Sequence, residues 1–234
     1  MESTLLFLVK GPLFRFSLAI MALGLARIIL IALTAMVQAY RRAGNHNIDL
    51  ARIIKQTAAG IIPPFSKLSH PGLYSIASYL FHVGLVIVPL FLHGHIQLWK
   101  KGIGISWPAL PPTWADGLSL LVIFTGIGLL GGRLASIHLR RLSSLQDYFI
   151  LLLILGTFLT GILVAHPNWN PFPYQATLIT HALSGDFLLV LVPFSKLAHI
   201  ILWPIRNLAT ELAWHFPPQA GAKILSTLGK EDKV

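Results

Sequence analysis

Histidine is the main side chain in this sequence that could bind a metal, because ten histidines are present and cysteine is absent. Five of them lie in two long apolar stretches: His82, His93 and His95 in one, His181 and His199 in the other. Ionisable side chains are costly within a membrane and therefore mark functional positions. Without cysteine, disulfides, iron–sulfur ligation and covalently attached haem c are excluded, so a redox cofactor would depend on histidine.

The spacing of these histidines predicts two haem b sites. His181 and His199 are eighteen residues apart, or five turns of an α-helix, so both rings would leave one face about 27 Å apart. If the two stretches are antiparallel helices, His82 meets His199, and His93 or His95 meets His181. Haem iron accepts two axial imidazole nitrogens from facing helices. Zinc is the competing interpretation, but zinc needs four ligands at one point.

The spacing alone does not decide whether His93 or His95 is the partner of His181. His93 would lie only about 20° from the face of His82 on an ideal helix, whereas His95 would lie about 140° away. Pro89 lies between them and permits a kink, so ideal helix phase is not reliable here. Glycines beside the ligands (Gly84, Gly94 and Gly185) would leave room for a flat macrocycle.

The elements that position these histidines are membrane spans. Of the 234 residues, 55% are hydrophobic and 11% are charged, and the mean hydropathy is +0.71, which indicates a protein solvated by lipid. Hydropathy predicts a single membrane domain over 1–234, an all-α bundle of five transmembrane helices. The predicted spans are 12–38, 72–98, 115–136, 145–166 and 178–203, with an amphipathic interfacial helix over 48–62 and a tail over 204–234.

Charge distribution predicts the orientation. Lysine and arginine concentrate in the 41–70 connection, the 133–147 loop and the tail, which the positive-inside rule assigns to the cytoplasm. The N-terminus would then be outside and the C-terminus cytoplasmic, in the inner (cytoplasmic) membrane of a cell. The net charge of +10 reflects this loop pattern, and no basic stripe with interleaved aromatic residues indicates nucleic-acid binding.

Several motifs resemble the gamma subunit of respiratory nitrate reductase, a dihaem cytochrome b. They are Phe81-His82-Val83-Gly84, the Pro89 to His95 stretch, Thr180 to Asp186, and Pro193 to His199. The sequence looks still closer to the small cytochrome b subunits of transmembrane redox complexes in sulfate-reducing bacteria, including the high-molecular-weight cytochrome c complex. The resemblance covers roughly residues 70–205, and its most specific part is the eighteen-residue histidine spacing.

The resemblance implies that the outer ligand of the second span follows a glycine, which favours His95 over His93. It also implies electron exchange with menaquinone or another quinone near the outer haem. Quinone chemistry needs proton donors near the carbonyl oxygens. Candidate contacts by position are His93, Lys100, Asp116, His166 and Asp186. The span-two spacing is longer here than in the nitrate reductase subunit, and no basic residue matches that subunit's quinone-site lysine.

Arginines are the candidate partners of haem propionates. Arg27 lies deep in the first span, where an unpaired charge is costly, and Arg133 lies at the inner end of the third. The resulting prediction is an electron-transfer subunit without substrate chemistry of its own. Its partners would be membrane lipid, a quinone, and a cytoplasmic iron–sulfur subunit or an outer multihaem cytochrome c. The alternatives are a transporter or scaffold with a histidine and aspartate proton pathway, and an anchor with a single haem.

Overall fold

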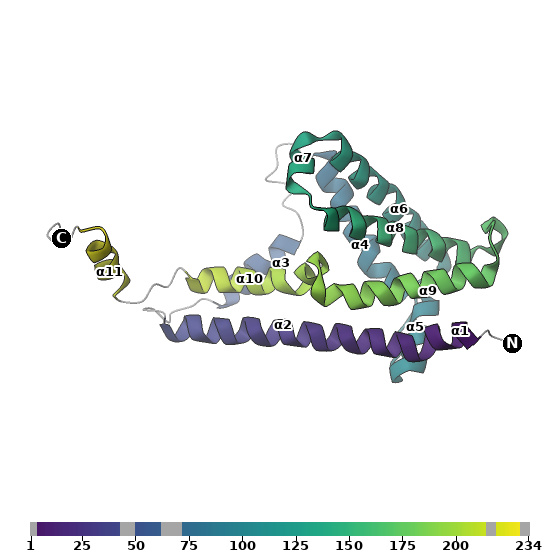
Figure 1. Ribbon diagram of the computed structural model, residues 1–234, viewed down its shortest axis with the longest axis horizontal. Helices are drawn as coiled ribbons and strands as arrows, with labels where there is room; N and C mark the ends of the chain where they lie inside the picture. The colour runs from purple at the N-terminus through teal and green to yellow at the C-terminus, as the bar shows by residue number, and fades with distance from the viewer. Residues whose placement is uncertain (1–3, 43–49, 62–71, 214–218, 230–234) are drawn as a thin grey trace. The chain divides into compact units, whose positions relative to one another are not determined.

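The computed structural model describes residues 4–42, 50–61, 72–213 and 219–229 (Figure 1). These residues form α-helices and short helical turns, and none of them lies in a β-strand. The chain divides into two compact units. Unit 1 comprises Met1–Leu23 and Phe65–Lys196, and unit 2 comprises Gly24–Pro64 and Leu197–Val234.

Unit 1 is a helical bundle in which α4 (Leu73–Phe91), α6 (Pro112–Ala135) and α8 (Leu145–Ala165) lie side by side (Figure 1). α8 also packs along α9 (Tyr174–Leu191), which contacts the N-terminal α1 (Thr4–Leu8) and the π-helical turn Val9–Leu13. Apolar side chains fill the contacts between these helices; they include Phe81, Val88, Val122, Ile154, Phe158 and Ile162. The bundle therefore has a continuous core from α4 to α9.

Five helical stretches are long and apolar enough to cross a membrane, which confirms the predicted number of spans. They are Thr4–Arg42, Leu73–Phe91, Pro112–Ala135, Leu145–Ala165 and Tyr174–Phe194. Much of their apolar surface is exposed: Leu23, Phe124 and Leu159, for example, are more than half exposed. Exposed apolar surface on this scale requires an apolar solvent, so the chain is a multi-pass membrane protein.

The second predicted span, 72–98, is wrong as one continuous helix. α4 ends at Phe91, Leu92 has extended backbone angles (φ −70°, ψ 130°), and a second helix, α5, runs from His93 to Ile103. Pro89 lies inside the last turn of α4, where it removes a backbone donor and weakens the helix. The first span also departs from 12–38, because helical structure runs from Thr4 to Arg42.

The fifth predicted span, 178–203, is also interrupted. α9 ends at Leu191 and is followed by two 3₁₀ turns, Val192–Phe194 and Lys196–Ala198, with extended Ser195 between them. Pro193 cannot donate a backbone hydrogen bond, which accounts for the end of the α-helix here. His199 begins a separate helix, α10 (His199–Ala213). The spacing predicted that the eighteen residues from His181 to His199 form five turns of one helix. This prediction is wrong, because the helix is interrupted between them.

Unit 2 contains α3 (Leu50–Ile61), α10, α11 (Ala220–Thr227) and the part of α2 (Phe14–Arg42) from Gly24 onward. α3 confirms a helix within the predicted 48–62 segment, whose ends lie outside the described residues, and it packs against α10. α10 continues ten residues into the predicted 204–234 tail. The prediction of one domain over the whole chain stays a prediction.

Candidate functional site

Within unit 1, the structure brings His95 of α5 and His181 of α9 together. Their ring centres are 5.9 Å apart and their ring planes are within 11° of parallel. Two imidazoles that bind one metal ion from opposite sides, each through a bond of about 2 Å, have ring centres about 6 Å apart. The separation of the two stacked rings is therefore compatible with two histidines that bind one metal ion between them.

Hydrogen bonds fix the orientation of both rings. Nδ1 of His95 lies 3.1 Å from the Pro89 carbonyl oxygen, and Nδ1 of His181 lies 2.9 Å from the Thr157 carbonyl oxygen. A carbonyl oxygen only accepts, so Nδ1 carries the hydrogen and Nε2 carries the lone pair. Histidines that bind metals typically donate their other ring N–H in this way. Both residues thus hold the tautomer that a metal ligand needs.

The break after α4 accounts for the position of His95. The last carbonyl groups of a helix have no partner within that helix. Here the Pro89 carbonyl accepts from His95, the Leu90 carbonyl accepts from Trp107 Nε1 at 2.8 Å, and the Phe91 carbonyl accepts from the Leu110 N–H at 2.8 Å. The end of α4 is therefore tied to α5 and to the loop after it, which holds His95 in place.

α8 forms the surface against which His181 lies. Besides the Thr157 carbonyl, Thr160 contributes its hydroxyl oxygen at 3.4 Å from His181 Nδ1. Gly161 faces the ring directly, since a Cβ atom built there would lie 2.9 Å from His181 Cε1. None of these three residues was predicted from the sequence. Gly161 alone carried a signal, because a glycine within a membrane span often marks a close contact with another helix.

His93 does not take part in this pair. It is exposed on α5, and its Nε2 lies 3.5 Å from Gln97 Nε2. The helix break at Leu92 explains why ideal helix phase favoured the wrong neighbour for His181: phase holds only along one unbroken helix, and α4 ends before His93.

The second predicted pair, His82 and His199, is divided between the two units. His82 lies on α4 in unit 1, and its Nδ1 is 2.6 Å from the Ser78 carbonyl oxygen, so it also holds its hydrogen on Nδ1. His199 is the first residue of α10 in unit 2. Their pairing stays a prediction.

The glycines beside the predicted ligands have different environments. Gly84 packs against α6, since a Cβ there would lie 2.5 Å from Val122 Cγ2 and 3.0 Å from the Leu118 carbonyl oxygen. It therefore serves helix packing, which corrects its predicted role as space for a macrocycle. Gly94 and Gly185 have no other group within 4 Å of a built Cβ, so open space remains beside each ligand helix.

Of the quinone candidates, the structure brings Asp116 and His166 together. Asp116 Oδ1 lies 3.2 Å from His166 Nε2, which joins the first turns of α6 to the C-cap of α8. The His166 ring also stacks on Trp169, with ring centres 4.4 Å apart. Lys100 is exposed on α5. Asp186 is buried in α9, and its Oδ2 has no hydrogen-bond partner among the described residues.

The two propionate candidates differ in environment. Arg133 is half-buried in unit 1 and ties three helices together, because Nε donates to the Tyr74 hydroxyl at 3.1 Å and Nη1 donates to the Asp147 carbonyl at 3.0 Å. Arg27 is exposed on the part of α2 that belongs to unit 2. Arg133 therefore has a packing role that the sequence did not indicate.

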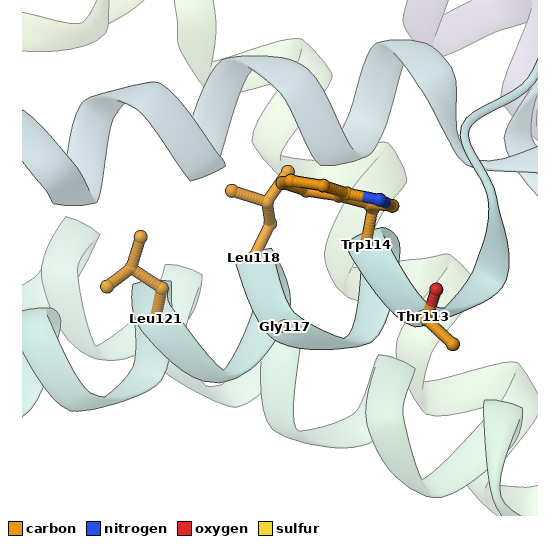
Figure 2. A pocket seen from close by; sticks show the side chains of 5 residues that line it. All are labelled: Thr113, Trp114, Gly117, Leu118 and Leu121. Atoms are coloured by element: carbon orange, nitrogen blue, oxygen red, sulfur yellow. The ribbon is translucent and has the colours of Figure 1, made fainter.

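An apolar hollow of about 360 Å³ lies along the first turns of α6 (Figure 2). Thr113, Trp114, Gly117, Leu118 and Leu121 line it. None of the predicted site residues contributes to this lining.

In the described part of the chain, no three His, Asp or Glu side chains gather into a group that could hold a metal ion.

Comparison with known proteins finds a relative over about two thirds of the chain. A curated protein of Nitratidesulfovibrio vulgaris (strain Hildenborough), named "Protein", is 35% identical to the chain over 150 residues, which cover 63% of this chain and 65% of the relative. The chain thus spans slightly less than two thirds of that relative's length, and the relative's name assigns no function. No protein family and no solved structure matches the chain.

Proposed function

We propose that the chain is the membrane-embedded cytochrome b subunit of a respiratory redox complex and that it carries two b-type haems. The observation that carries this proposal is the His95 and His181 pair, with ring centres 5.9 Å apart and Nδ1 of each ring directed to a backbone carbonyl. Haem would supply one-electron chemistry at this position. The protein would hold it through the two Nε2 atoms and exclude water with the surrounding spans.

The second haem is proposed on the basis of the sequence, which predicts His82 and His199 as its ligands. The His82 ring, like the first pair, keeps its hydrogen on Nδ1 through a backbone carbonyl. Two haems at different depths would let electrons cross the membrane. The resemblance to sulfate-reducer cytochrome b subunits supports this arrangement, and the relative in Nitratidesulfovibrio vulgaris also comes from a sulfate reducer.

Haem content tests the proposal directly. The full-length chain, purified in detergent, is expected to show a b-type α band in the reduced-minus-oxidised spectrum and two haems per chain. His181→Ala and His199→Ala are each expected to reduce this number to one. A wild-type chain without an α band contradicts the proposal.

The quinone site is proposed at the pair formed by Asp116 and His166. A carboxylate 3.2 Å from an imidazole can pass a proton to or from a quinone oxygen. Asp116→Asn is expected to slow haem reoxidation by a menaquinone analogue and to leave the haem content unchanged. Lys100→Gln, which alters another exposed candidate, serves as the comparison. Equal reoxidation rates in Asp116→Asn and wild type contradict this site.

Orientation and partners follow from the charge pattern. We propose that the chain lies in the inner membrane with its N-terminus outside, and that its basic cytoplasmic face binds an iron–sulfur subunit or its outer face binds a multihaem cytochrome c. The chain has no cysteine, so single cysteines report on sidedness. In intact cells, Ser106→Cys is expected to react with an impermeant maleimide and His138→Cys is not. The reverse pattern contradicts this orientation.

A proton-conducting transporter or scaffold is the second candidate, and one observation favours it. Asp186 is buried in a span, and its Oδ2 lacks a hydrogen-bond partner among the described residues. Buried carboxyl groups in spans commonly relay protons. This candidate requires no haem, so the same absorption spectrum decides between the two functions.

A further inference from the structure

The surface of α8 against which the His181 ring lies consists of the Thr157 carbonyl, the Thr160 hydroxyl and the Cα of Gly161; we call it the α8 seat. We propose that the α8 seat positions the His181 imidazole and thereby sets the reduction potential of the haem that His181 would bind. This inference rests on the proposed haem function. It assigns Thr160 and Gly161 as positioning residues that do not themselves contact the iron.

The geometry leaves the ring little freedom at the seat. The Thr157 carbonyl accepts from Nδ1 at 2.9 Å, and the Thr160 hydroxyl oxygen lies 3.4 Å from the same nitrogen. On the adjacent edge of the ring, a Cβ atom at position 161 would lie 2.9 Å from Cε1, 3.3 Å from Nδ1 and 3.7 Å from Nε2. Only glycine permits this approach of α8, so any other residue would displace the imidazole.

Thr160 is itself held in place by its own helix. Its hydroxyl donates to the Gly156 carbonyl at 2.8 Å and lies 3.0 Å from the Thr157 carbonyl. The lone pairs of this hydroxyl are therefore directed by α8 toward His181. A second acceptor at Nδ1 increases the negative character of the ring and makes Nε2 a stronger donor to iron. Stronger donation favours ferric over ferrous iron and lowers the reduction potential.

Near-parallel rings are the second consequence of the seat. The planes of His95 and His181 differ by 11°, and His95 is held independently by the Pro89 carbonyl. Displacement of only one ring would change this angle. The electron paramagnetic resonance spectrum of low-spin ferric haem responds to the angle between its axial imidazoles, so the seat has a spectroscopic signature.

Gly161→Ala tests the seat, and Gly156→Ala on the same helix is the matched control. No other group lies within 4 Å of a Cβ built at position 156. In the full-length chain with its haems, Gly161→Ala is expected to raise the midpoint potential of one of two haem components and to shift its low-spin resonance, or to lose that haem alone. Gly156→Ala is expected to match the wild type in all three readouts.

Thr160→Val keeps the inference testable if Gly161→Ala does not fold. This change replaces the hydroxyl with a methyl group of similar size, and it is expected to retain both haems while raising the potential of the same component. Retention of the haem that His181 does not bind would show that the variant is folded. An unchanged midpoint potential and resonance in Thr160→Val overturns the inference, as does a Gly161→Ala protein that matches Gly156→Ala. A wild type without haem would instead contradict the proposed function itself.

Discussion

The two ends of the bundle in unit 1 use their polar side chains differently. At one end, His95 and His181 each direct Nδ1 to a backbone carbonyl. At the other end, Arg133 donates to both Tyr74 and Asp147, and the Lys196 ammonium contacts the Asp147 carboxylate and the Ser144 hydroxyl.

The polar side chains at one end of the bundle therefore join helices to one another, whereas the histidines at the other end are oriented in a way that suits a bound ligand. Arg133 joins α6 to α4 and α8, and Lys196 joins the chain after α9 to the capped first turn of α8. Charged donors with such partners contribute to stability. The histidines instead each use Nδ1 for a hydrogen bond to a backbone carbonyl, which leaves Nε2 as the atom that could bind a metal.

The largest expected effect distinguishes His95 from its neighbour His93. His95→Ala is expected to reduce the haem content from two to one per chain, because it would remove one of the two nitrogens proposed to bind the haem iron. His93→Ala is expected to retain both haems, since His93 is exposed and next to Gln97. Haem quantified against protein in purified samples measures both. Loss of a haem in His93→Ala and not in His95→Ala would show that His93 is the haem ligand and His95 is not.

The next effect concerns the opposite end. Arg133→Gln removes a charged donor from the Tyr74 hydroxyl and the Asp147 carbonyl, and hydrogen bonds to charged groups contribute about 1.5–3 kcal/mol each. We expect a loss of about 3 kcal/mol in the free energy of unfolding with both haems retained, because two such hydrogen bonds are lost. Thermal unfolding in detergent and haem content measure the two outcomes. Loss of one haem would show that Arg133 also holds a propionate.

The sequence was sufficient to predict the membrane class, because hydropathy and length determine where lipid can solvate a helix. Five spans and the α3 helix follow from such local patterns. The sequence also predicted that His181 pairs with His93 or His95. When two spans are antiparallel, the end of one lies beside the start of the other. This holds even where the helix face that carries each histidine cannot be predicted.

The helix interruptions at Leu92 and Ser195 could not be derived from spacing. A proline permits several outcomes, and tertiary partners select the one observed: Trp107 and Leu110 donate hydrogen bonds to the carbonyl groups at the end of α4. The roles of Gly161 and Arg133 were missed for the same reason. Each depends on contacts between residues far apart in the chain, which one sequence does not reveal.

A smaller effect on stability is expected from a change at Trp107, in the loop after α5 that contacts the end of α4. Trp107→Phe keeps an aromatic ring against Trp99 but removes the Nε1 donor from the Leu90 carbonyl. We expect a loss of about 1 kcal/mol in the free energy of unfolding, because the carbonyl loses its hydrogen bond. Trp114→Phe, at an exposed position, is the control. Equal midpoints of thermal unfolding for both variants would mean that Trp107 does not support the end of α4.

The smallest effect is expected at the Lys196 and Asp147 pair. Lys196 is 52% exposed in its side chain, and ion pairs at exposed positions contribute about 0–1 kcal/mol. Lys196→Gln is therefore expected to lower the midpoint of thermal unfolding slightly at low salt and less at high salt, because ions screen the pair. Lys100→Gln at the histidine end is expected to have no such salt dependence. A large loss in Lys196→Gln at every salt concentration, accompanied by loss of a haem, would mean that this end also holds the cofactor and would remove the contrast between the two ends.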